Sequence, residues 1–222
     1  MALQGILFDW RGTLVRDPDD AWWVRSALSR LERSASETAV VEVVDRLRGA
    51  SQSQIVIEAQ KTADCSAEQH RTATMLWYSE ANLDAALAGT LYSLDLDPIA
   101  HPYYEAVPET LRRIKAKGLS VAIVSDIHFD LRPEFALEGL DGLVDHFILS
   151  FEHGVQKPDP RIFTLALDVL GLGATEAIMI GDRPDRDGPA VQVGIPTLLL
   201  PSERGSRRGL DVVLAIVEAR AG

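Results

Sequence analysis

Apolar residues gather in short runs through the second half of the chain, and longer amphipathic stretches separate these runs. The runs have the length of buried strands and lie at Leu119–Val124, Leu143–Leu149, Ala177–Ile180 and Thr197–Leu200. Helix-length stretches fall between and after them, at 108–117, 160–170, 187–193 and 209–221. Strands that alternate with helices in this way predict βαβ units, and hence an α/β fold with a parallel sheet and helices on both faces.

The first half of the chain has a different pattern. One more apolar run occurs at Leu3–Phe8, but no convincing strand follows it between about Asp17 and His101. Helical periodicity recurs there at Trp22–Leu31, Val40–Leu47 and Thr72–Leu87, with Asp20 as a candidate N-cap and Gly49 and Gly89 as candidate helix ends. We therefore expect an α/β domain formed by residues 1–16 and 102–222, interrupted at 17–101 by a small all-helical domain.

The acidic composition narrows the range of partners. The 222 residues carry a net charge of −11, which leaves no excess of Lys and Arg to displace counterions from nucleic acid or to bind an anionic membrane. The single cysteine, Cys65, excludes an intramolecular disulfide and fits a reducing compartment. The segment MALQGILFDW lacks the features of a signal peptide, and no run reaches the ~18 apolar residues that span a bilayer. These features predict a cytoplasmic protein without nucleic-acid or membrane partners.

Four polar or charged residues each stand at the end of a predicted strand. They are Asp9 after LQGILF, Ser125 after LSVAIV, Lys157 after SFEHGVQ and Asp182 after AIMIG. Because parallel strands end at the same edge of a sheet, we expect these side chains to lie close together. Two carboxylates, a hydroxyl and an ammonium suit the binding of a divalent cation and a phosphoryl group. The sequence therefore predicts a shared metal and phosphate site.

The segments around these residues resemble the four motifs of the haloacid dehalogenase (HAD) superfamily. The resemblance covers residues 1–16 and 103–200, and rests on FDWRGTL, AIVSD, GVQKPDPRIF and IGDRPDRDGPAVQVG, in that order. It implies a Rossmann-like parallel sheet, and the helical insertion stands where such proteins carry a C1-type cap domain. No motif of the insertion itself matches a known cap.

The resemblance also implies roles for the strand-end residues. Asp9 is expected to be the nucleophile, forming an aspartyl-phosphate, and to bind Mg²⁺ through its other oxygen. Asp182 is expected to be a second metal ligand, and the backbone carbonyl of Arg11 a third. Ser125 is expected to donate a hydrogen bond to the phosphate, and Lys157 to pair with both Asp9 and the phosphate.

A further acid is expected to support the metal without binding it. Asp187, five residues after Asp182, is the favoured candidate, and Asp185 is the alternative. Asp126, next to Ser125, suits an N-cap as well as a functional group.

The chain departs from the family pattern at Arg11. Phosphatases of the superfamily usually have an Asp at this position, which protonates the leaving oxygen and then activates water; arginine stays protonated and can do neither. His128, Asp130 and Glu152 are candidate replacements for that acid and base. Alternatively, the Arg11 guanidinium could grip a phosphate or carboxylate of the substrate, or neutralise Asp9 and Asp182.

The favoured hypothesis is a Mg²⁺-dependent, HAD-like phosphatase that acts on a small phosphorylated metabolite, slowly because of Arg11. The alternative is a catalytically impaired protein that binds a phosphorylated ligand or a partner protein through the same site. A dehalogenase is less favoured, because HAD dehalogenases lack the Gly-Asp pair that this chain keeps at Gly181 and Asp182. Neither the substrate nor the oligomeric state can be predicted from the sequence.

Overall fold

The computed structural model describes residues 2–97, 100–200 and 209–220. The chain divides into two compact units, one formed by Met1–Arg16 with Pro102–Gly222 and the other by Asp17–His101. We call the first the α/β unit and the second the helical unit. The described residues of the helical unit form helices and no strand.

A five-stranded parallel sheet forms the centre of the α/β unit, in the order β3-β2-β1-β4-β5. The strands are β1 Gly5–Phe8, β2 Ser120–Ser125, β3 His146–Leu149, β4 Ala177–Gly181 and β5 Thr197–Leu199. Successive strands are added on one side of β1 up to β3, and then on the other side with β4 and β5. The sheet therefore reverses its direction of growth at β1, and such a switch point is where open α/β sheets bind ligands.

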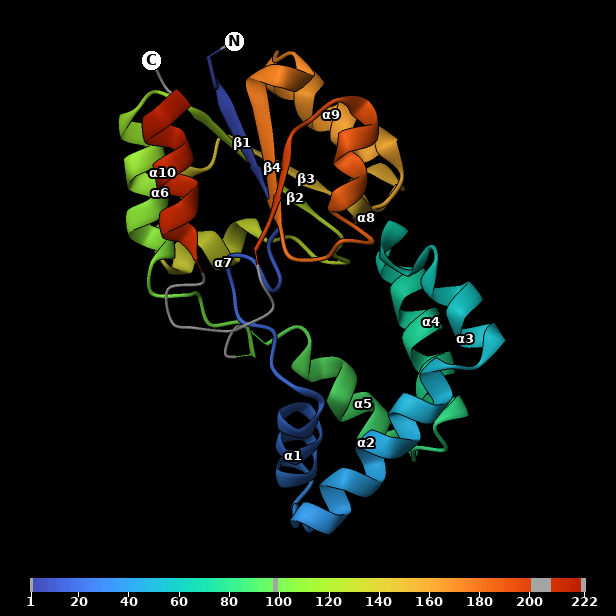
Figure 1. Ribbon diagram of the computed structural model, residues 1–222. Coiled ribbons are helices and arrows are strands. Elements are labelled where there is room, and N and C mark those ends of the chain that lie inside the picture. Colours follow the sequence, from blue (N-terminus) through green and yellow to red (C-terminus); the bar gives the residue numbers. More distant parts are fainter. Residues whose placement is uncertain (1, 98–99, 201–208, 221–222) are drawn as a thin grey trace. The chain divides into compact units, whose positions relative to one another are not determined.

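Helices cover both faces of this sheet, as the alternating pattern predicts (Figure 1). The α helices of the unit are α6 Val107–Ala116, α7 Arg132–Leu137, α8 Ser150–His153, α9 Pro160–Leu170 and α10 Leu210–Arg220. Helices α6 and α10 pack together in one layer, and α9 packs against β2 and β3 in the other. The predicted Rossmann-like α/β fold is thus confirmed.

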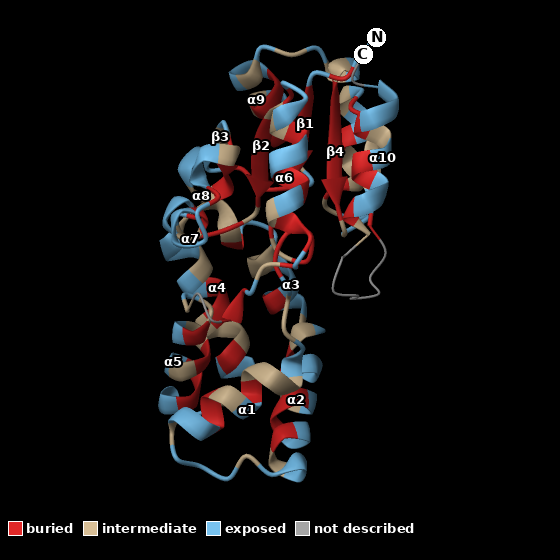
Figure 2. Ribbon diagram, turned by 90° about the vertical axis from the view of Figure 1, so that its left-hand side faces the viewer, coloured by how far each residue is buried: buried red, intermediate tan, exposed pale blue. Residues whose placement is uncertain are grey.

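The central strand shows why the sheet needs both layers. All four residues of β1 are buried, so the run GILF has no solvent-facing side. Ile6 and Phe8 pack in the cluster that includes residues of α6 and α10, whereas Leu7 packs in the cluster that includes residues of α9. Figure 2 shows the result as buried strands between helices whose outer faces are exposed. Continuous apolarity, rather than alternation, is typical of a strand covered on both faces.

Local signals placed most helix ends of the α/β unit correctly. Helix α6 is followed by Gly118 and α9 by Gly171, both with the positive φ of a left-handed C-terminal residue. The segment predicted as a helix at 187–193 is 3₁₀ over Gly188–Val193, and the strand predicted from Leu143 begins only at His146. The sequence did not predict α7 and α8, which are short.

The helical unit has its own apolar core. Its α helices are α1 Asp20–Arg30, α2 Glu37–Ser51, α3 Gln54–Gln60, α4 Ala67–Glu80 and α5 Ala85–Leu94. Buried Val, Leu and Ala side chains from α1, α2 and α5 form one cluster with Tyr78 of α4. A single core shared by these helices accounts for the helical periodicity of a stretch without strands.

Three details of the helical unit correct the sequence prediction. Asp19, not Asp20, caps α1, because its carboxylate accepts the amide hydrogen of Trp22. Gly49 and Gly89 lie inside α2 and α5 rather than after them. The helix predicted over 72–87 is two helices, because Asn82 has a positive φ and Asp84 caps a new helix from Ala85.

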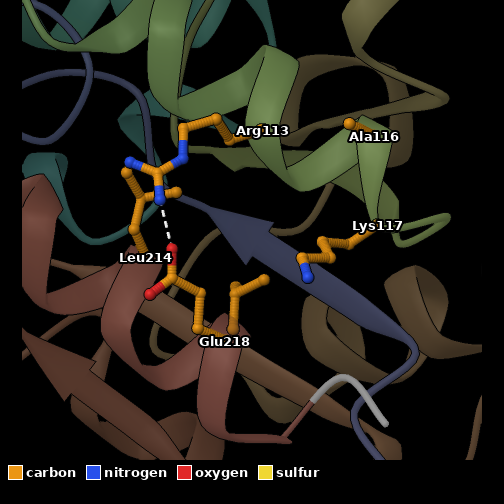
Figure 3. A pocket seen from close by; sticks show the side chains of 6 residues that line it. Arg113, Ala116, Lys117, Leu214 and Glu218 are labelled. Carbon is orange, nitrogen blue, oxygen red and sulfur yellow. Dashed lines mark hydrogen bonds and ion pairs between the residues drawn. The ribbon is translucent and has the colours of Figure 1, made fainter.

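Among the helices of the described residues, none has the length and apolarity needed to cross a membrane. A pocket of about 140 Å³ lies between α6 and α10 (Figure 3). Its charged lining includes Arg113 and Glu218, which pair with each other. These residues belong to the helical layer of the α/β unit, and none of the strand-end residues lines this pocket.

Candidate active site

The carboxyl ends of β1 and β4 bring two predicted site residues to the same level of the sheet. Phe8 pairs with Ile180 in the register of these strands, and the amide of Asp9 donates to the carbonyl of Ile180 at 2.9 Å. Asp9 therefore leaves β1 directly beside the end of β4, where Asp182 follows Gly181. This is the switch point of the sheet.

The ammonium of Lys157 is the centre of a buried ion cluster. Its Nζ lies 2.6 Å from Oδ1 of Asp9 and 2.6 Å from Oδ1 of Asp187. The Lys157 side chain is only 2% exposed, and that of Asp187 only 1%. A buried lysine needs such partners, because an unpaired ammonium costs several kcal/mol to remove from water. The fold thus brings together residues that lie 148 positions apart.

Asp187 is held from every side, which fits a supporting role better than a ligand role. While Oδ1 accepts from Lys157, Oδ2 accepts the backbone amides of Asp182 and Arg183 at 3.1 and 3.0 Å. The carboxylate also packs on Gly181, where an added Cβ would lie 2.2 Å from it. Asp187 therefore fixes both the ammonium and the start of the loop that carries Asp182.

The loop after β1 curls tightly around Asp9. The carbonyl of Trp10 accepts the amides of Thr13, Leu14 and Val15, and the Thr13 hydroxyl donates to Oδ2 of Asp9 at 3.0 Å. Gly12 has a φ of +80°, and a Cβ there would lie 2.5 Å from Oδ2 of Asp182. Only glycine combines this conformation with this close approach. The glycine lets the first loop pack directly against the Asp182 carboxylate.

The three carboxylates of this site could hold a metal ion. Asp9, Asp182 and Asp187 each offer an oxygen, and these oxygens lie within 4.8 Å of one another. Three carboxylates and the Lys157 ammonium carry a formal charge of −2, which a divalent cation balances. Oxygen ligands from one or two carboxylates are what Mg²⁺ prefers, so the donor set fits this metal. Asp187 fits a ligand role less well than Asp9, because its two oxygens accept three hydrogen bonds, whereas those of Asp9 accept two, from Lys157 and Thr13.

The same charges act on the ionisation of the site. Burial raises the pKa of the Asp9 carboxyl, Lys157 opposes this change, and Asp187 and Asp182 raise the pKa further. Burial also disfavours the charged form of Lys157, but Asp9 and Asp187 outweigh it and keep the pKa of the ammonium above its usual value. An added cation would stabilise the ionised Asp9 carboxylate.

A second network holds the backbone of Lys157. The amide of Lys157 donates to Oδ1 of Asp126 at 2.7 Å, and the Arg186 guanidinium donates to the Lys157 carbonyl. The Arg186 guanidinium also lies 3.6 Å from Oδ2 of Asp126. Asp126 is therefore bound to the lysine loop rather than acting as a helix N-cap.

Ser125 and Arg11 occupy positions at the same edge. Ser125 is the last residue of β2 and is buried, next to the end of β1. Arg11 is partly buried in the loop after Asp9, and its guanidinium carbon lies 6.0 Å from the centroid of the Trp10 ring. A cation over an indole is a favourable arrangement.

The candidate replacements for the acid and base have other contacts. Asp130 and Glu152 both pair with Arg132, at 2.8 and 2.7 Å. His128 is buried, with its ring 5.1 Å from that of Phe129. Asp185 pairs with Arg183 and is exposed, so it does not replace Asp187 in the ion cluster.

Two residues of the site were given no role by the sequence. Thr13 is part of the segment FDWRGTL, and Arg186 stands next to Asp187 in the fourth motif. The close spacing of Thr13 to Asp9, across a glycine turn, is the signal that could have identified the hydroxyl. No comparable signal exists for Arg186, since its partners Asp126 and Lys157 are distant in sequence.

Known proteins resemble this chain in sequence and in fold. The pattern of a hydrolase family, the haloacid dehalogenase-like hydrolases, matches residues 3–193. A phosphoserine phosphatase of Thermus thermophilus is 38% identical over 90 residues, which are 39% of this chain and 35% of that protein. The haloacid dehalogenase-like hydrolase domain-containing protein 3 of Danio rerio is 34% identical over 130 residues, 57% of this chain and 52% of that protein. The chain thus spans about a third to a half of these relatives.

A longer but weaker match is an acid sugar phosphatase of Staphylococcus epidermidis, 26% identical over 88% of this chain and 85% of that protein. Among solved structures, a putative HAD-hydrolase of Bacillus subtilis bound to magnesium gives a TM-score of 0.72 at 15% identity, covering 98% of this chain and 99% of that one. A HAD phosphatase of Thermococcus onnurineus gives 0.66 at 20% identity, covering 99% and 100%. At these identities the structural likeness concerns the fold.

Proposed function

The chain belongs to the haloacid dehalogenase-like hydrolase family, and we propose that it is a Mg²⁺-dependent phosphatase of small phosphorylated metabolites, with Asp9 as the nucleophile. The observation that carries the proposal is the buried contact of Lys157 with both Asp9 and Asp187. This contact places a carboxylate next to a cation at the switch point of the sheet. Phosphoryl transfer needs both a nucleophile and a group that neutralises charge. Relatives named as phosphatases support this choice of reaction.

Each residue of the site has a part in this proposal. An Asp9 oxygen forms the new bond to phosphorus, while Lys157 and Thr13 hold the carboxylate in one orientation. Lys157 also offsets the negative charge of the incoming phosphate. Ser125, at the end of the neighbouring strand, donates a hydrogen bond to a phosphoryl oxygen.

The metal would be held by Asp9, Asp182 and the backbone carbonyl of Arg11, with Asp187 as the support behind them. When bound, Mg²⁺ supplies positive charge that screens the phosphate from the carboxylates. None of these residues belongs to the helical unit. We propose that the helical unit selects the substrate.

Arg11 sets the expected rate. A positioned acid or base contributes about 10²–10⁴ in rate, and arginine supplies neither function at this position. We therefore expect a slow phosphatase on ordinary phosphate esters.

The proposal is tested by measuring phosphate release from a panel of phosphate esters with the wild type and Asp9→Asn. We expect release that requires Mg²⁺, stops with a chelator, and is reduced to background in Asp9→Asn. Asp141→Asn, which changes an exposed carboxylate, is the matched control and should retain the wild-type rate. Release that is equal in wild type and Asp9→Asn would refute the assignment of the nucleophile.

Arg11 also supports a second candidate function. If turnover fails because Arg11 replaces the acid and base, the same ion cluster could still bind a phosphorylated ligand or a partner protein. In that case no ester is hydrolysed, but Mg²⁺ or inorganic phosphate raises the melting temperature of the wild type through binding to the native state.

A further inference from the structure

In the proposed reaction, the oxygen that leaves phosphorus needs a proton if it is strongly basic. The residues around Asp9 do not supply that proton. When the Asp9 oxygen bonds to phosphorus, the bond from phosphorus to the leaving oxygen breaks, and that oxygen keeps the electron pair. An alkoxide is about as basic as hydroxide, whose conjugate acid has a pKa of ~15.7, so its departure needs a proton. A carboxylate, with a conjugate acid of pKa ~4, leaves without one.

The polar groups around Asp9 already make other hydrogen bonds and ion pairs. The Lys157 ammonium is held by two buried carboxylates, and both oxygens of Asp187 accept hydrogen bonds. The Thr13 hydroxyl donates to Asp9 itself. None of these three groups is arranged to hand a proton to an oxygen that departs from phosphorus.

Arg11 follows Asp9 on the same loop but keeps its proton. The loop from Trp10 to Val15 is fixed by three amides that share one carbonyl, and the guanidinium lies near the Trp10 ring. Arg11 stands two residues after Asp9 on this short loop, so its guanidinium can supply positive charge to the leaving oxygen as negative charge develops there, but it cannot supply a proton. This favours leaving groups that depart as anions.

We propose that the substrates of this site are phosphorylated compounds with weakly basic leaving groups, acyl phosphates foremost, and that Arg11 determines this specificity. The inference rests on the proposed function. In the first step the acyl oxygen departs as a free carboxylate while Asp9 takes the phosphoryl group. In the second step water bonds to phosphorus, Asp9 departs as a carboxylate, and the protons of the water remain on inorganic phosphate and solvent. No step requires a proton donor of high pKa.

The dependence of rate on the leaving group tests this directly. We would measure kcat/KM for acetyl phosphate, p-nitrophenyl phosphate, phenyl phosphate and glycerol 3-phosphate, with Mg²⁺ present throughout. For the wild type we expect a steep fall along this series, with acetyl phosphate above glycerol 3-phosphate by about 10²–10⁴-fold, the usual worth of a positioned acid. Arg11→Asp should raise the rate on glycerol 3-phosphate far more than on acetyl phosphate, and so flatten the series.

Two variants distinguish the effect of the Arg11 positive charge from the effect of a proton donor in the site. Arg11→Asn removes the cation without adding an acid, so it should leave the series steep and lower the rate on acetyl phosphate. His128→Gln tests the buried histidine as a donor and should leave the wild-type series unchanged. Arg112→Asp makes the same charge change on an exposed residue of α6 and serves as the control.

A shallow series in the wild type would overturn the inference. So would an equal rise for all substrates in Arg11→Asp, or a steeper series in His128→Gln. These outcomes differ from failure of the proposed function, in which none of the substrates, acetyl phosphate included, releases phosphate in an Asp9-dependent way. Circular dichroism and melting temperatures confirm that each variant is folded, and Arg11→Asn provides a second test if Arg11→Asp is not.

Discussion

A single buried ammonium compensates two carboxylates in this site. Because Lys157 is almost fully buried between Asp9 and Asp187, its removal leaves two carboxylates without their shared cation. Breaking a buried ion pair at one partner costs about 3–5 kcal/mol. We therefore expect Lys157→Met to lower the free energy of unfolding by about this amount, measured by urea denaturation.

The control for that variant is Lys117→Met, which removes an exposed lysine from the end of α6. Exposed charges contribute little, so this change should stay within about 0.5 kcal/mol of the wild type. Equal stability of the two variants would mean that Lys157 is not held as the structure describes.

Gly12 offers a second test at the scale of one residue. Alanine at Gly12 would combine a left-handed backbone with a Cβ 2.5 Å from Oδ2 of Asp182. Gly118 has a similar φ of +74° but open space around the position of a Cβ. We expect Gly118→Ala to cost about 1–2 kcal/mol from the backbone alone. Gly12→Ala should cost more and should also reduce the proposed phosphatase activity. Equal costs, with activity retained, would argue against the close approach of the two loops.

The sequence correctly predicted Asp9, Ser125 and Asp182 at or directly after strand ends. Lys157, also predicted at a strand end, instead lies in the loop between α8 and α9. Asp9 and Asp182 each follow a short apolar run, so their approach follows from the rule that parallel strands end at one edge. The contact of Lys157 with Asp187 depends on how two distant loops fold back, and no local pattern encodes it. The same holds for Arg186, which meets Asp126 and the Lys157 carbonyl only in three dimensions.

At the scale of elements, the loop before α9 presents Lys157 to the site. Arg186 and Asp126 hold the backbone of that loop, so Arg186→Met should let the ammonium move away from Asp9. We expect a lower kcat and a higher KM, because in the proposed function Lys157 both orients Asp9 and pairs with the phosphate. Arg161→Met is the matched control, since Arg161 pairs with Asp159 in the same region but is largely exposed. A kcat equal to that of the wild type in Arg186→Met would show that the loop needs no such clamp.

Asp145 joins three elements and gives a prediction for pH. It lies just before β3, pairs with Lys115 of α6 and accepts the amide of Val121 in β2 at 2.7 Å. Burial raises the pKa of the Asp145 carboxyl, but the hydrogen bonds from Lys115 and Val121 outweigh it, and the net pKa is lowered. A lowered pKa contributes stability that is present above the ordinary value near 3.8 and is lost as the pH falls below it.

We therefore expect Asp145→Asn to melt at a lower temperature than the wild type at neutral pH, with the difference shrinking below about pH 4. Melting curves across this range measure the effect. A difference that is the same at every pH would assign the loss to packing rather than to the charge.

Elements were predicted best where local chemistry determines their ends. Gly118 and Gly171 end α6 and α9 because glycine accepts the left-handed conformation without strain. In the helical unit, the prediction that Gly49 and Gly89 end helices was wrong. Both lie inside helices, α2 and α5, that continue past the glycine. The break at Asn82 was missed because asparagine is a weaker signal for a positive φ than glycine.

For the whole molecule, the sequence predicted the class of fold but not the order of its strands. Alternation of strands and helices requires a parallel sheet with two helical layers, and the structure has both. The position of β1 between β2 and β4 depends on the packing of every crossover, which periodicity does not encode. That order is what sets Asp9 next to Asp182 and creates the switch point.

The central claim is that Asp9 takes the phosphoryl group. The most direct test is to incubate the wild type with Mg²⁺ and acetyl phosphate, quench with acid, and map the protein by mass spectrometry. We predict a phosphoryl group on the peptide that contains Asp9, absent from Asp9→Asn and lost when the enzyme is left to turn over. Continued release of phosphate by the wild type with no phosphoryl group on Asp9, or with one on another residue, would contradict the account.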